Sequence, residues 1–300
     1  MNLTRKIDLA LEARELALGD LPPETALDGV TVRDGLVCGL PVTHVQIETQ
    51  KGAEALGKPP GAYYTLSLPS IPRDRADLLR AAEATAGILG QMPGLPRQGL
   101  VLAAGLGNRE ITPDALGPLT MDRLLVTRHL TEVLPMAKAL RPVAAMAAGV
   151  SGSTGIETGE LLRALVEQLH PVCLIAVDAL AARHQENVCR TIQISDTGII
   201  PGSGVGNARL PLTEKTLGVP VLAVGVPTVV DAATLCLDLM AQQDLPPLDP
   251  SVFRQEGEEW FLTPRTIGRA LTATAQALGL GISQALHRSL TLEEIESWLA

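Results

Sequence analysis

Two aspartates occupy comparable positions on this chain, and they are the residues best suited to chemistry. Asp114 lies in the turn region after the apolar run 99–106, and Asp178 directly follows the apolar run 172–177. A carboxylate placed where a buried strand ends is positioned at a cleft of an α/β sheet. Each aspartate taken alone is equally compatible with a helix N-cap, so the interpretation depends on the pair.

The spacing of the two aspartates favours a catalytic pair. Positions 114 and 178 are 64 residues apart, which is about the separation needed to bring two strands of a parallel sheet side by side. Two carboxyl groups that share one proton can activate water on one side of a peptide bond and protonate the other side, because their repulsion raises one pKa. We therefore predict a hydrolase.

The composition is typical of a globular α/β protein. Of 300 residues, 46% are hydrophobic and only 2% are aromatic, so aliphatic side chains must build the core. The formal net charge of -9 disfavours a surface made for nucleic-acid phosphates. No segment has the pattern of a signal peptide or a membrane span, and the cysteine spacing favours free thiols. We expect a cytoplasmic protein with no direct nucleic-acid or membrane partner.

Apolar runs alternate with helical patterns through most of the chain. The expected strands are a hairpin over 29–48 and single strands at 63–68, 99–106, 143–148, 172–177 and 219–226. The expected helices are 73–89, 160–170, 231–243, 263–287 and 291–299, with another that begins directly after Asp178 over 179–186. This alternation predicts an α/β fold, a mainly parallel sheet with helices on both faces. A linker is expected at 245–250, followed by a C-terminal helical segment, 251–300.

The other polar motifs carry weaker signals. The glycine-rich loop 202–207 lacks the lysine and the following helix of a phosphate-binding loop, so a structural or substrate-contacting turn is favoured. No histidine pair has the spacing of a zinc hydrolase, and we expect neither a metal nor another cofactor. His129 is a candidate beside the site, with a buried structural histidine as the alternative. The remaining candidates for substrate contacts or oxyanion donors are Gly107, Asn108, Gly204 and Asn207.

Long strings throughout the chain closely resemble the germination protease (GPR endopeptidase, or spore protease) family of spore-forming bacteria. They include Thr112-Pro113-Asp114-Ala115-Leu116-Gly117-Pro118 and the segments 106–108, 126–130, 155–160, 178–183, 191–198, 201–207, 225–234 and 261–264. The resemblance implies an endopeptidase that degrades small acid-soluble spore proteins during germination, in the spore interior. It also implies a homotetramer with a fold similar to hydrogenase-maturation proteases. The family's two catalytic aspartates map onto Asp114 and Asp178.

The resemblance further implies an inactive precursor that cuts itself near its N-terminus. The family motif resembles Arg-Thr-Asp-Leu-Ala, and this chain has Lys6-Ile7-Asp8-Leu9-Ala10, which places the cut between Asp8 and Leu9. The chain departs from the pattern, because Ile7 replaces a hydroxyl residue and the leader is shorter. We expect a propeptide of residues 1–8 that lies over the cleft, followed by a single α/β peptidase domain over 9–300.

Two alternatives remain open at this point. The same carboxylates could hold a divalent cation in a metal-dependent peptidase. The chain could also be a non-enzymatic binder of spore proteins that uses its acidic surface.

Overall fold

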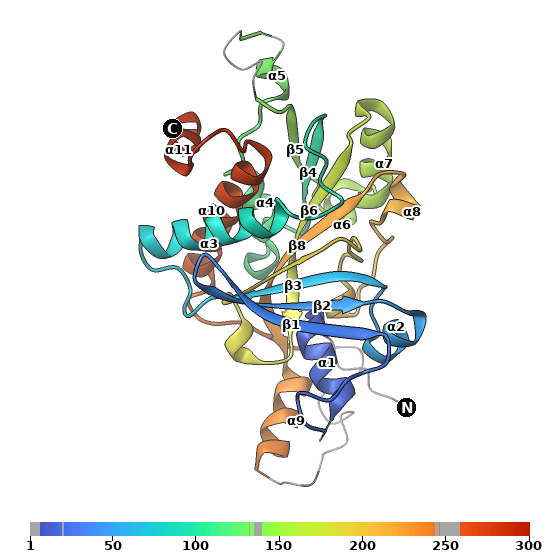
Figure 1. Ribbon diagram of the computed structural model, residues 1–300. Helices are drawn as coiled ribbons and strands as arrows, with labels where there is room; N and C mark the ends of the chain where they lie inside the picture. The colour runs from blue at the N-terminus through green and yellow to red at the C-terminus, as the bar shows by residue number, and fades with distance from the viewer. Residues whose placement is uncertain (1–6, 20, 132, 135–139, 244–245, 247–258) are drawn as a thin grey trace.

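One mixed sheet organises the part of the chain that the computed structural model describes, residues 7–19, 21–131, 133–134, 140–243, 246 and 259–300 (Figure 1). Its strands are β1 (Val30–Val37), β2 (Leu40–Ile47), β3 (Gly61–Ser67), β4 (Val101–Gly105), β5 (Val143–Ala147), β6 (Cys173–Ala182), β7 (Thr191–Ser195), β8 (Val221–Asp231) and β9 (Phe261–Leu262). The strand order is β1-β2-β3-β7-β8-β6-β4-β5, and β9 pairs with β8.

The sheet has a parallel half and an antiparallel half. Strands β8, β6, β4 and β5 are parallel to one another, whereas β1, β2, β3 and β7 continue the sheet with antiparallel pairing. The predicted α/β fold is confirmed. Its parallel part is the block that carries both aspartates, and the predicted hairpin over 29–48 forms β1 and β2 at the opposite edge.

Helices cover both faces of the sheet, as expected (Figure 1). They are α1 (Ala10–Leu18), α2 (Gln50–Leu56), α3 (Arg75–Leu89), α4 (Leu116–Met121), α5 (Arg128–Thr131), α6 (Ser151–Thr154), α7 (Thr158–Leu169), α8 (Glu214–Leu217), α9 (Ala232–Gln242), α10 (Ile267–Leu286) and α11 (Leu292–Leu299), with the short 3-10 turns η1 (Thr112–Asp114), η3 (Gln185–Asn187) and η4 (Ser203–Val205). Helices α3, α4 and α10 cover one face, and α7 and α8 cover the other. The predicted C-terminal helices are confirmed as α10 and α11.

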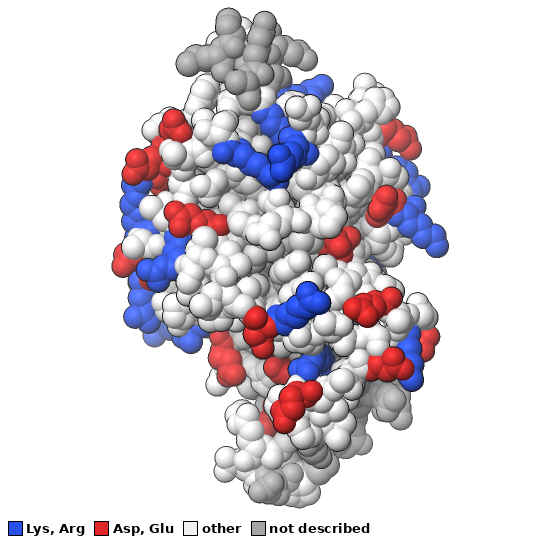
Figure 2. Space-filling view, in the orientation of Figure 1, with Lys and Arg blue, Asp and Glu red and all other residues white. Residues whose placement is uncertain are grey.

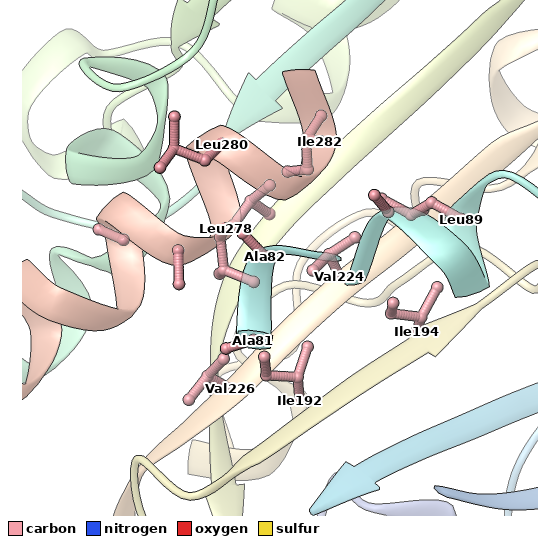
Figure 3. Packing of buried hydrophobic residues seen from close by; sticks show 14 of the residues in the cluster. Ala81, Ala82, Leu89, Ile192, Ile194, Val224, Val226, Leu278, Leu280 and Ile282 are labelled. Carbon is pink, nitrogen blue, oxygen red and sulfur yellow. The ribbon is translucent and has the colours of Figure 1, made fainter. Parts of the chain in front are cut away.

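The largest core lies between the sheet and the pair α3 and α10 (Figure 3). The labelled side chains that meet there are Ala81, Ala82, Leu89, Ile192, Ile194, Val224, Val226, Leu278, Leu280 and Ile282. The two helices can approach closely because α10 has glycine at position 281, where a Cβ atom would lie 2.6 Å from the Ala82 carbonyl oxygen. Each large aliphatic side chain buried here contributes roughly 1.5–3 kcal/mol to folding.

The alternation of side chains along the strands decides which polar residues face the other side of the sheet. Ile192 and Ile194 belong to the core under α3 and α10, and so does Val177. Because successive side chains on a strand point to opposite faces, Gln193 and Asp178 point away from that core. Both polar side chains therefore lie on the face that α7 and α8 cover.

One predicted helix is wrong, and it bears directly on the site. Residues 179–186 do not begin a helix after Asp178, because β6 continues to Ala182 and only the 3-10 turn Gln185–Asn187 follows. The small, apolar residues after Asp178 fit either conformation, and pairing with β8 decides in favour of a strand.

Side chains cap the first turns of α9 and α11. Asp231 caps α9 by accepting a hydrogen bond from the Thr234 N–H, and Thr291 forms a capping box with Glu294 at the start of α11. Of the predicted linker only residue 246 is described, and 251–258 of the C-terminal segment also lie outside the described residues.

Charged side chains of both signs are interspersed on the face of the molecule shown in Figure 2. Among the described helices, none combines the length and the apolar composition that a membrane span needs.

Candidate active site

Asp114 is held at the carboxyl end of β4 by a tightly packed turn. It ends the 3-10 turn η1, and its Oδ2 accepts a hydrogen bond of 2.7 Å from the Asn108 N–H. Gly107 adopts a left-handed backbone conformation (φ 98°), and a side chain there would overlap the Asp114 carbonyl oxygen. Glycine at 107 therefore allows the loop to fold back and fixes the position of the carboxylate.

Asp178 lies within β6, beside the point where the neighbouring strand β4 ends. Strand β4 ends at Gly105, which pairs with Val177, so β4 does not pair with β6 from Asp178 onward. The prediction that Asp178 follows the end of its own strand is thus corrected. The Asp178 residue is 5% exposed, and its Oδ1 accepts a 2.9 Å hydrogen bond from the Ala179 N–H.

The two aspartates line one cavity of about 600 Å³. Its wall is built from the loop after β4, the loop before α7, the strands β6 and β8, and the loop that contains η4. Leu106, Ile111, Val150 and Phe261 give this wall an apolar character, and Arg209 supplies a cation that pairs with Glu157 at 3.2 Å. The predicted convergence of Asp114 and Asp178 on one cavity is found in the structure.

The electrostatics of the pair are those of two carboxyl groups competing for one negative charge. The pKa of Asp178 is raised well above its ordinary value, first by burial, then by the charge of Asp114, and then by the charge of Asp8. Burial also raises the pKa of Asp114, while the hydrogen bond from Asn108 acts in the opposite direction. Burial and the neighbouring charges thus disfavour the ionised form of Asp178 in particular.

The other predicted site residues divide into those at the cavity and those away from it. Gly107, Asn108 and Asn207 line the cavity, whereas His129 lies exposed on the short helix α5 and is not among the lining residues. The Asn108 N–H is already bonded to Asp114, and the Asn207 N–H donates to Gly202 within its own loop. Neither backbone N–H is therefore available as an oxyanion donor in this conformation. Gly204 is buried against the side chain of Asp8.

The N-terminal segment reaches the same region. The Asp8 N–H donates to the Ala181 carbonyl oxygen at 3.0 Å, and the Asp8 carboxylate accepts from the Ala181 N–H and the Ser203 hydroxyl. Leu9 and Ala10 are fully buried. Asp8, the first of the two predicted cleavage residues, is thus bound to β6 at Ala181, three residues along that strand from Asp178.

Gln193, which the sequence did not single out, binds the N-terminal segment beside the cavity. Its side-chain Nε2 donates to the Asp8 carbonyl oxygen at 3.1 Å, and its Oε1 accepts from the Ala10 N–H at 2.7 Å. Gln193 and Asp178 both pair with Gly225, so the three form a row across β7, β8 and β6. The Cα atoms of Gln193 and Asp178 are thus about 10 Å apart, two strand spacings. No local pattern marks a glutamine whose partners are more than 180 residues away in sequence.

The helix α1 that follows is anchored by a buried acid. The Glu12 carboxylate accepts hydrogen bonds from the Arg183 and His184 N–H groups and from the Asn187 side chain. Burial raises the pKa of Glu12, and these three donors oppose the shift. Glu15 adds a 3.1 Å contact with His184. The segment that would follow a cut at Asp8–Leu9 is therefore part of the folded domain.

Within the described residues, no three His, Cys, Asp or Glu side chains gather in a manner that could hold a metal ion. In that part of the chain, no third side chain of these types joins Asp114 and Asp178 to form a metal site.

Comparison with known proteins finds relatives that align with nearly the whole chain. A family model described as germination protease matches residues 10–243, which include both aspartates. The germination proteases of Clostridium perfringens and Caldanaerobacter subterraneus are each 39% identical to this chain, over alignments that cover 98% of each protein. The germination protease of Priestia megaterium is 43% identical over 78% of this chain and 65% of its own length.

Proposed function

Because the chain belongs to the germination protease family, we propose that it cleaves small acid-soluble spore proteins during germination, with Asp114 and Asp178 as its catalytic pair. One observation carries the proposal. A buried carboxyl group and a second carboxyl group that raises its pKa line the same cavity, which is large enough for a segment of peptide. Perturbed acids in a cleft are typical of catalytic sites.

The raised pKa of Asp178 supports the following roles within the proposed pair. The ionised Asp114 takes a proton from a water molecule, whose oxygen bonds to the carbonyl carbon of the substrate. The protonated Asp178 donates its proton to the amide nitrogen as the carbon–nitrogen bond breaks. The products are a carboxylic acid and an amine, and the pair still holds one proton, now on Asp114. Its transfer to Asp178 restores the starting state.

Self-processing at the Asp8–Leu9 bond belongs to the same proposal. It is supported by the proximity of the Asp8 charge to Asp178 and by the hydrogen bonds that hold the backbone on both sides of this bond. N-terminal sequencing of protein aged under activating conditions should reveal a new terminus at Leu9. The Asp114→Asn variant should keep its original N-terminus, and an intact N-terminus in fully active wild-type protein would contradict self-processing.

Incubation with a purified small acid-soluble spore protein tests the activity directly. Wild type, Asp114→Asn and Asp178→Asn are compared, with Asp34→Asn on the exposed β1 strand as the matched control. Both site variants should lose roughly 10²–10⁴-fold in cleavage rate, since a positioned acid or base contributes this much. The control should cleave like the wild type. Full activity in both site variants would refute the catalytic pair.

The same assay separates the alternatives. Loss of cleavage with a chelator and recovery with added metal would favour a metal-dependent peptidase, and stable binding without fragments would favour a non-enzymatic binder. A homotetramer and a location in the spore interior are further parts of the proposal. Light scattering of the purified protein measures the first, and fractionation of dormant spores tests the second.

A further inference from the structure

A second cavity, of about 920 Å³, lies on the side of the sheet that α3 and α10 cover. Its wall is built from the segment between β3 and α3, the start of α3, the turn before β7, the first half of α10 and one residue of α11. Helices α3, α10 and α11 lie together at the left of Figure 1. Among the described residues, none lines both this cavity and the aspartate cavity, so the two are separate.

Arginines from three distant parts of the chain line this cavity. Arg73 and Arg75 come from the residues just before α3 and from its first position. Arg190 belongs to the turn before β7, and Arg269 lies in the first turn of α10. Arg75 is paired with Glu296 of α11 at 2.6 Å. Over the described part of the chain, the side chains of the other three arginines make no hydrogen bond or ion pair.

The two acids at the cavity are already engaged. The Asp74 carboxylate caps α3 by accepting a 2.9 Å hydrogen bond from the Asp77 N–H. The Glu296 carboxylate is held by Arg75. The three remaining arginines are therefore not neutralised by the acids that line the cavity, although the whole chain carries a formal net charge of -9. The cavity is thus a local basic region that attracts anions.

Phosphate is the anion that these groups fit. A phosphate monoester carries up to two negative charges and three terminal oxygens, and planar guanidinium groups bind such oxygens through paired hydrogen bonds. The Thr266 hydroxyl and the Gln276 amide line the same cavity and add neutral donors. A volume of about 920 Å³ is within the range of small-molecule sites. The excess of Asp and Glu over Lys and Arg in the chain, 33 against 24, disfavours a nucleic acid as the source of the phosphate.

We propose that this cavity binds a small organic phosphate through Arg73, Arg190 and Arg269. The site is independent of the proposed endopeptidase chemistry, because it shares no described residue with the aspartate cavity. Bound phosphate stabilises the folded chain, since the three segments that supply the arginines meet only in the fold.

Isothermal titration calorimetry of the full chain with pyrophosphate tests the site. Sodium chloride keeps the ionic strength constant, because general attraction to a basic region weakens with salt. Pyrophosphate should bind saturably. Citrate, whose carboxylates each present two oxygens rather than three, should bind at least about tenfold more weakly.

Arg190→Gln and Arg269→Gln should each weaken pyrophosphate binding by roughly 10- to 100-fold, since each removes charge-assisted hydrogen bonds. Arg163→Gln on α7 is the matched control, because it removes the same charge from an exposed arginine that does not line the cavity. It should bind pyrophosphate like the wild type. All three side chains are exposed, so the variants should fold, and far-UV circular dichroism would check this.

The outcomes separate a specific site from general attraction to positive charge. Saturable binding that both cavity variants weaken and Arg163→Gln does not would support the site. Wild type that shows no saturable binding in the millimolar range would refute it, and so would an equal loss in all three variants. Citrate bound as tightly as pyrophosphate would overturn the assignment to phosphate. None of these results depends on cleavage, so a failure here leaves the proposed endopeptidase function standing.

Discussion

Replacing Asp178 with asparagine should stabilise the fold while it removes activity, and the gain should depend on pH. Burial and the charges of Asp114 and Asp8 raise the pKa of Asp178 in the folded chain well above its ordinary value. Between the unfolded pKa of about 3.9 and the raised folded pKa, the folded chain therefore holds one proton more than the unfolded chain. The unfolded state is favoured progressively across this window as the pH rises.

The size of the effect follows from proton linkage. Each pH unit within the window lowers the stability of the wild type by about 1.4 kcal/mol, and the loss ends at the folded pKa. Below the unfolded pKa the group is protonated in both states and contributes no pH dependence. Asparagine stays neutral, so the Asp178→Asn variant should lack this slope. For a chain of this size, 1 kcal/mol corresponds to roughly 2 °C in melting temperature.

Melting temperatures followed by far-UV circular dichroism from pH 4 to pH 8 would measure this dependence. Wild type and Asp178→Asn should melt alike at the acid end and diverge as the pH rises. Asp114→Asn should make the decline end at a lower pH without abolishing it, because burial is the largest cause of the raised Asp178 pKa and the Asp114 charge is the second. Parallel curves for wild type and Asp178→Asn would refute the reasoning, since they would mean that Asp178 ionises as readily in the folded state as in the unfolded state.

Three further substitutions test the framework around the site. Glu12→Ala removes a buried acceptor of three hydrogen bonds from the loop after β6, and urea unfolding should show a loss of about 3 kcal/mol; a loss below 0.5 kcal/mol, as at an exposed site, would contradict the anchoring of α1. Gly107→Ala should lower peptide cleavage far more than Gly155→Ala, because both glycines have positive φ but only a methyl group at 107 overlaps Asp114; equal effects in the cleavage assay would show that backbone strain alone matters. Leu278→Ala should cost about 2–5 kcal/mol in the same unfolding experiment, and a smaller loss would mean that the core between α3 and α10 can close the cavity.

Local patterns in the sequence indicated the α/β architecture and the two aspartates that line the cavity. Apolar runs such as 99–106 and 172–177 are long enough to be buried on both faces, so they indicated strands of a parallel sheet before any pairing was known. The caps Asp231 and Thr291 are local features of the same kind, because each bonds to a partner three residues away. The pairing of Asp114 with Asp178 followed from strand adjacency, a rule that needs only order and spacing.

How Asp114 and Asp178 come to face the cavity, and which residues surround them, depends on tertiary contacts. Because β4 ends before β6 does, Asp178 lines the cavity from within its strand. The length of β6 depends on its pairing with β8 rather than on local propensity. The Asp8 side chain accepts hydrogen bonds from Ala181 and Ser203, which lie 173 and 195 positions away in the sequence. Gln193 on β7 donates to the Asp8 carbonyl oxygen. Such contacts leave no periodic trace in the sequence, because hydrogen bonds between distant segments depend on where the folded backbone places their donors and acceptors.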